Sequence, residues 1–117
     1  MVAPTKQAVP GALVSGNNFQ MVSWESIAAD NDAWENAIGG GVTVQVSGTF
    51  DGATVSIEGS NDGTNFFTLN DPQGNPLDIS TSGTIKEVLE APRYLKPTRA
   101  GGTAPDLDVI LCVRRSK

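Results

Sequence analysis

One aspartate and two asparagines lie in a short stretch near the middle of the chain, GSNDGTNF at residues 59–66. Four oxygen-bearing side chains there could bind calcium: Asn61, Asp62, Thr64 and Asn65. The spacing and the closing glutamate of an EF-hand are missing, however. A tight turn with Gly63 in a left-handed conformation explains the same residues without a metal. We therefore expect a structural loop and neither metal nor cofactor.

Two pairs of carboxylates could in principle support glycoside hydrolysis, Asp30 with Asp32 and Asp106 with Asp108. Both pairs lie in or beside predicted loops, and no cleft is indicated that would raise the pKa of one partner alone. The chain has no histidine, which removes Ser-His-Asp and Cys-His catalysis and the usual transition-metal sites. We expect solvated loop acids, no catalytic residues and no enzymatic activity.

Charge and cysteine content narrow the classes of partner. A net charge of -5 argues against general nucleic-acid binding. Cys112 is the only cysteine, so an internal disulfide is excluded and a cysteine-based zinc site is not expected. The basic run Arg114, Arg115 and Lys117 is either a solvated terminus or a contact for an acidic protein surface. No membrane helix or signal peptide is predicted, which fits synthesis in the cytoplasm.

Four aromatic residues could form a platform for sugars: Trp24, Trp34, Phe66 and Tyr94. Exposed aromatics without a cleft more often mark protein contacts. Three interpretations stay open for them, namely a protein contact, the core of a second sheet and a sugar site.

The elements that must position these residues are predicted to be short strands. Apolar and polar residues alternate over residues 42–47 and again over residues 53–58, on either side of Asp51-Gly52. A two-residue Asp-Gly turn predicts a hairpin in which Phe50 faces Ala53 and both apolar sets share one face. For the next connection, a three-residue loop over residues 61–63 would bring Phe67 and Leu69 into the core and leave Phe66 on the other face.

Further strands are expected at residues 19–24, 77–79, 84–89, 93–97 and 107–113. Residues 26–37 could be a short helix or an irregular loop. Pro97 suits an edge strand, and the unbroken apolar run at residues 109–113 indicates a strand covered on both faces or central to an assembly contact. Seven to eight short strands with frequent turns predict an all-β antiparallel sandwich, jelly-roll-like, over residues 19–117, preceded by an extended arm at residues 1–18.

The blocks VTVQVSGTFDGATVSIEGSNDGTNFFTL, DPQGNPLDIS and EAPRYLKPTRAGG, followed by a strand ending in VRR, give the chain a resemblance to a known family. It resembles small tailed-bacteriophage virion proteins that decorate or cement the capsid. The resemblance implies a non-enzymatic sandwich that binds major capsid proteins on the outer surface of the virion, self-associates as a dimer or trimer, and needs no nucleic acid or membrane. A tail or baseplate component is a variant of this interpretation.

A second likeness concerns two shorter motifs. GSNDGTNF and PRYLKP resemble the hairpin and strand motifs of discoidin-like carbohydrate-binding jelly rolls. Here Phe66 or Phe67 stands where a tryptophan is usual, and Pro97 interrupts the second motif. This likeness implies a carbohydrate-binding module as the alternative function.

Two sets of residues follow from these interpretations. The predicted partner contacts are Phe66, Trp34, Val109, Leu111, Arg114, Arg115 and Lys117. The predicted structural turns are formed by Asp51, Gly52, Asp62 and Gly63.

Overall fold

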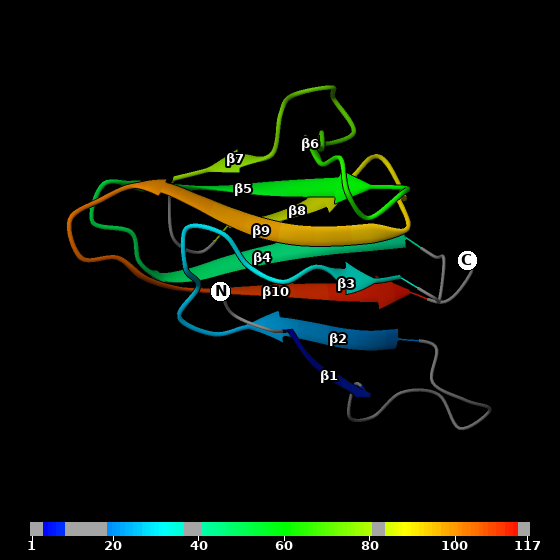
Figure 1. The fold of residues 1–117 in the computed structure, drawn as a ribbon, viewed down its shortest axis with the longest axis horizontal. Helices are drawn as coiled ribbons and strands as arrows, with labels where there is room; N and C mark the ends of the chain where they lie inside the picture. Colours follow the sequence, from blue (N-terminus) through cyan, green and yellow to red (C-terminus); the bar gives the residue numbers. More distant parts are fainter. Residues whose placement is uncertain (1–3, 9–18, 37–40, 81–83, 115–117) are drawn as a thin grey trace.

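The computed structural model describes residues 4–8, 19–36, 41–80 and 84–114, which form two antiparallel sheets packed as a sandwich (Figure 1). Sheet A contains, in order, β1 (Thr5–Ala8), β2 (Phe19–Trp24), β10 (Asp106–Arg114), β4 (Gly41–Thr49) and β8 (Thr84–Val88). Sheet B contains, in order, β3 (Trp34–Glu35), β9 (Tyr94–Gly101), β5 (Ala53–Ser60) and β6 (Phe67–Thr68), with β7 (Asp78–Ile79) also on β5.

The strand order confirms the jelly-roll prediction. From β2 onward the chain passes back and forth between the sheets, and β6 and β7 together occupy one edge of β5. The result is two four-stranded layers of β2-β10-β4-β8 and β3-β9-β5-β6, the arrangement of an eight-stranded jelly roll. None of the described residues forms a helix that is long and apolar enough to cross a membrane.

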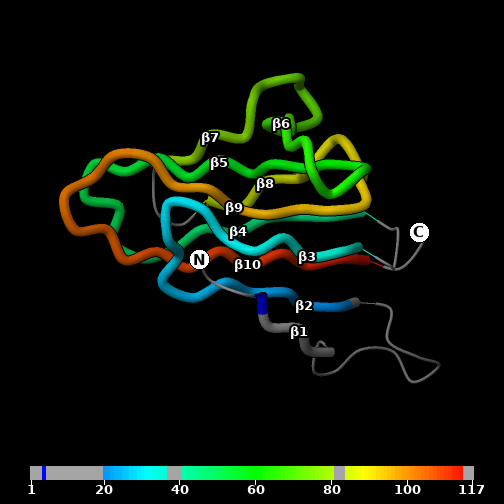
Figure 2. Tube along the Cα trace, viewed as in Figure 1, coloured from blue at the N-terminus to red at the C-terminus, as the bar shows by residue number. Residues whose placement is uncertain are grey.

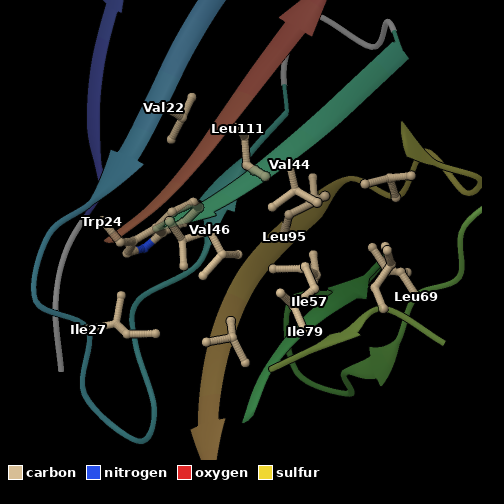
Figure 3. Packing of buried hydrophobic residues seen from close by; sticks show 14 of the residues in the cluster. Val22, Trp24, Ile27, Val44, Val46, Ile57, Leu69, Ile79, Leu95 and Leu111 are labelled. Atoms are coloured by element: carbon tan, nitrogen blue, oxygen red, sulfur yellow. The ribbon is translucent and has the colours of Figure 1, made fainter. Parts of the chain in front are cut away.

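The core lies between the two sheets, and both sheets contribute alternate residues to it (Figure 3). Trp24, Val44 and Leu111 of sheet A are buried against the layer that holds Ile57 and Leu95 of sheet B. The indole nitrogen of Trp24 donates a hydrogen bond to the Asp32 carbonyl (2.8 Å), so the largest buried ring leaves no polar group unpaired.

The predicted hairpin over residues 42–57 is wrong in its pairing, although its turn is present. Asp51 and Gly52 both have positive φ, and the Ala53 amide donates to the Phe50 carbonyl (2.8 Å), as a two-residue Asp-Gly turn requires. The flanking strands then diverge, because β4 pairs with β10 and β8 whereas β5 pairs with β9, β6 and β7 (Figure 2). Alternation of apolar and polar residues indicates only that one face of each strand is buried. Two such strands can bury that face as neighbours in one sheet or, as β4 and β5 do, from two sheets that face each other.

Two other segments settle open questions. Residues 25–33 form an irregular loop, and the short strand β3 follows it, so residues 26–36 contain no helix, which was one of the two alternatives there.

Within the predicted arm, β1 pairs antiparallel with β2, so this segment extends sheet A at its edge. Residues 1–3 and 9–18, the rest of the arm, lie outside the described residues.

Pro97 lies in β9, which is an interior strand of sheet B and not the expected edge. Its cross-strand neighbour Ile57 exchanges hydrogen bonds with Leu77 and Leu69 on its other side, so the missing N–H of Pro97 costs no bond between β9 and β5. On its far side, beyond the short β3, the Pro97 carbonyl accepts from the Asn31 side chain (3.0 Å). On the side where the missing N–H of Pro97 would point, a loop replaces the neighbouring strand. Pro97 is therefore locally in the position of an edge residue.

Candidate functional site

The loop at residues 61–65 is held by its own side chains. The Asp62 carboxylate accepts hydrogen bonds from the Thr64 amide (2.8 Å), the Asn65 amide (2.9 Å) and the Ser60 hydroxyl (2.7 Å). Bonds from the backbone of Asn65 and Thr64, and then from Ser60, hold the pKa of Asp62 well below its usual range. Such a carboxylate has no proton to donate near neutral pH, so it serves as a loop brace.

Gly63 confirms its predicted backbone role. Its φ is +80°, and a Cβ at this position would lie 3.2 Å from the ring of Tyr94. Glycine therefore serves both the left-handed turn and the close approach of the loop to β9. Among the described residues, no group of three potential metal ligands of the His, Cys, Asp and Glu types comes together.

The register after this loop differs from the predicted one. Glu58 pairs with Thr68 and Gly59 with Phe67, so the register is shifted by two residues from the one that a three-residue loop would set. Leu69 reaches the core as predicted, but Phe67 does not: it is 71% exposed. Hydrogen bonds between Ser60 and Asp62 stabilise a loop that is two residues longer than the predicted one. The prediction considered only backbone turn geometry and so did not include this side-chain contribution.

The exposed Phe67 borders an open groove of about 610 Å³ at this end of the sandwich. Its lining includes Asp62, Asn65, Phe67, Leu69, Glu90 and Pro92. Burial acts to raise the pKa of Glu90, yet hydrogen bonds from the backbone and side chain of Asn70 (2.8 and 2.7 Å) bring it below its ordinary value. Both carboxylates of the groove are therefore ionised near neutral pH and already hydrogen-bonded within the chain.

Phe66 lies half-buried on the outer face of sheet B. The Lys96 ammonium sits 4.4 Å from the centroid of its ring and also 2.9 Å from the Asp30 carboxylate. The hydrogen bond from Lys96 is the main cause of the lowered pKa of Asp30. The ring of this predicted contact residue thus already has a partner within the chain.

Three predicted contact residues prove to be core residues. Trp34 is 4% exposed, Val109 0% and Leu111 1%, so none of them presents a surface to a partner. Val109 and Leu111 point inward because side chains alternate along β10 and its odd-numbered positions face sheet B. Arg114 is exposed as expected, and Arg115 and Lys117 lie outside the described residues.

The outward side of β10 carries the residues that the sequence analysis missed. Ile110 and Cys112 are half-buried on the outer face of sheet A, and the register sets Ile110 between Ser23 and Gln45. Gln45 pairs in turn with Ile85 of β8, which is 66% exposed. The signal was present in the sequence, since the charged residues of this strand all fall at even positions and mark these as the solvent side.

No protein-family model matches the chain, and no curated protein matches it by sequence. Two solved structures share its fold. The SPBc2 prophage-derived protein YomS aligns over 81% of this chain and 93% of its own, with 10% identity and a TM-score of 0.57. The PBSX exported protein XepA aligns over 92% of this chain and 42% of its own, with 12% identity and a TM-score of 0.62. The chain thus spans less than half of XepA and shares the β-sandwich fold with both proteins.

Proposed function

We propose that the chain is a non-enzymatic viral structural protein that binds the outer surface of a phage capsid and cements neighbouring major capsid proteins. The observation that carries the proposal is the outer face of sheet A, where Ile110, Cys112 and Ile85 occupy surface positions that solvated sheets usually fill with polar residues. Such a face fits attachment to another protein.

Two further observations support this function over a catalytic one. The carboxylates at the groove are engaged in hydrogen bonds within the loops, and the ion pairs of sheet B join residues of this chain to each other. The fold is also that of two prophage-encoded proteins, which agrees with a virion component although it does not specify the capsid.

The test is co-sedimentation of the purified chain with expanded phage shells that lack it. We expect saturable binding to the shells and a higher temperature of shell disruption once they are decorated. Binding to isolated tails or baseplates, with none to shells, would place the protein in the tail and refute the cementing role.

One observation favours a second function, a carbohydrate-binding module. The groove beside Phe67 combines an exposed aromatic ring with the polar side chains of Asn61, Asn65 and Thr68. Glycan-array binding that disappears with Phe67→Ala, and persists with the control Ile85→Ala on sheet A, would support this module.

A further inference from the structure

The outer face of sheet A carries a charge pattern along its central strand. The outward residues of β10 are, in order, Asp106, Asp108, Ile110, Cys112 and Arg114. The strand is therefore acidic at one end, apolar at its middle and basic at the other end. The two carboxylates accept hydrogen bonds from Ser26 (2.8 and 2.9 Å) and keep their negative charge at the surface.

Across the sheet, the middle of this pattern continues as an uncharged row. The cross-strand register aligns Ser23, Ile110, Gln45 and Ile85 over four adjacent strands, β2, β10, β4 and β8 (Figure 1). The next row holds Met21, Cys112 and Thr43 and ends in Glu87 on the edge strand. The charged residues described on this face are therefore Asp106, Asp108 and Arg114 on β10 and Glu87 on β8.

From this pattern we infer that the outer face of sheet A binds the same face of a second copy of the chain, with the two β10 strands crossing antiparallel. A two-fold axis along the row of Ile110 and Ile85 stacks each isoleucine on its own counterpart. It also sets Arg114 of each copy above Asp106 of the other, with Asp108 two residues away along the strand. The alternative axis, along β10, would superimpose like charges at both ends, at a cost in free energy.

The size of the face fits a two-fold interface. Five strands about 4.8 Å apart, with about 3.4 Å per residue along the strands, give a face of at most roughly 700 Å². A stable interface buries about 600–1,000 Å² on each partner, so most of the face has to be covered. The charged residues described on this face, three acidic (Asp106, Asp108, Glu87) and one basic (Arg114), sum to −2, so each copy brings part of the acidic net charge of the chain into the interface. The inference assigns this face a different occupant from the capsid subunit proposed above, so the two proposals are tested separately, by sedimentation of the chain alone and by co-sedimentation with shells.

Sedimentation-velocity centrifugation of the full chain over a range of concentrations tests the interface. We expect a dimer, and we expect Ile110→Glu and the more exposed Ile85→Glu to weaken it at least tenfold. The matched control is Thr54→Glu, a half-buried outward position on sheet B, which should leave the dimer intact. Circular dichroism establishes that each variant is folded. A wild-type chain that stays monomeric, or a folded Ile85→Glu variant that dimerises normally, would overturn the inference.

The charge pattern gives a test of orientation. Arg114→Glu should weaken the dimer by repulsion from Asp106 and Asp108 of the second copy. Adding Asp106→Arg and Asp108→Arg to the same chain should restore it, since the complementary charges are then exchanged. Failure of the triple variant to recover, with its fold intact, would exclude the antiparallel arrangement.

Cys112 is the only cysteine, so cross-linking of the unmodified chain measures the distance between the Cys112 residues of two copies. Sheets about 10 Å apart and an offset of four residues along antiparallel strands place the two Cys112 Cα atoms about 17 Å apart. A parallel arrangement would bring them to about 10 Å. Bismaleimides spanning about 15 Å should therefore give covalent dimers efficiently and short ones poorly. More efficient linkage by the short reagent would contradict the proposed axis.

Discussion

The two outer faces of this sandwich have similar strand geometry and very different chemistry. On sheet B, charged side chains neutralise one another: Arg93 bonds Glu35 at 2.7 Å, and Lys96 bonds Asp30 at 2.9 Å while covering Phe66. On sheet A, the central positions are apolar or uncharged, and Ile85 is left largely exposed. A face whose charges are paired within the chain has little left for a partner. On the sheet A face the centre is uncharged, and the charged residues around it are Asp106, Asp108, Arg114 and Glu87.

The largest predicted effect is a difference in stability between substitutions on the inward and outward sides of β10. Leu111→Ala removes a core residue and should lower the free energy of unfolding by about 2–5 kcal/mol. Ile110→Ala, one residue earlier on the outward side, should cost about 1 kcal/mol or less in the dilute monomer. Urea unfolding at low protein concentration measures both. Equal losses would mean that the outer side of β10 is as much a part of the fold as its inner side.

A smaller effect should follow at the loop that packs on Tyr94 at the end of sheet B. Gly63→Ala places a Cβ near the Tyr94 ring at a positive φ, and we expect a loss of about 1–2 kcal/mol in thermal or urea unfolding. Gly74→Ala is the matched control, since Gly74 has φ of +87° with open space around it. The difference between the two variants isolates the contact with Tyr94. If both variants lose the same stability, the contact contributes nothing.

Removal of one pairing on sheet B should have a modest effect. Lys96→Met keeps most of the aliphatic stem but removes the charge that bridges Phe66 and Asp30, for an expected loss of about 0.5–1 kcal/mol in urea unfolding. Asp30→Asn, which retains the contact of Lys96 with the ring, should cost less. A Lys96→Met variant that gained affinity for a partner protein would show that sheet B binds only when its charges are unpaired.

The smallest predicted effect is a change in how steeply the free energy of unfolding falls with decreasing pH. Because the folded-state pKa of Asp62 lies below its ordinary value of 3.8, the unfolded chain binds the proton more tightly. This carboxylate therefore contributes stability above about pH 4 that is lost as the pH falls further. Asp62→Asn should show a shallower fall in unfolding free energy between about pH 4 and 2. An unchanged slope would mean that the loop does not depend on the ionised form.

The fold class was predictable because alternation over residues 42–47 and 53–58 is a local property that every β-sandwich requires. The pairing was not, since β4 and β5 meet different partners far along the chain. Leu69 was placed correctly and Phe67 wrongly because the loop length depends on hydrogen bonds of Ser60 and Asp62. Val109 and Leu111 were assigned to a contact and not to the core because the apolar run does not alternate, and only the charged residues near its two ends mark the side that faces water.

The position of β10 also has a consequence for how the chain is made. The strand β10 lies between β2 and β4, so neither of these strands has this partner until residues 106–114 have been synthesised. Until β10 is present, β2 and β4 each lack a hydrogen-bonded neighbour on one side. These unpaired strand edges can pair with other chains. Pairings of such long sequence separation slow folding. A chain truncated before residue 106 would lack the middle of its sheet and would be prone to aggregate through β2 and β4.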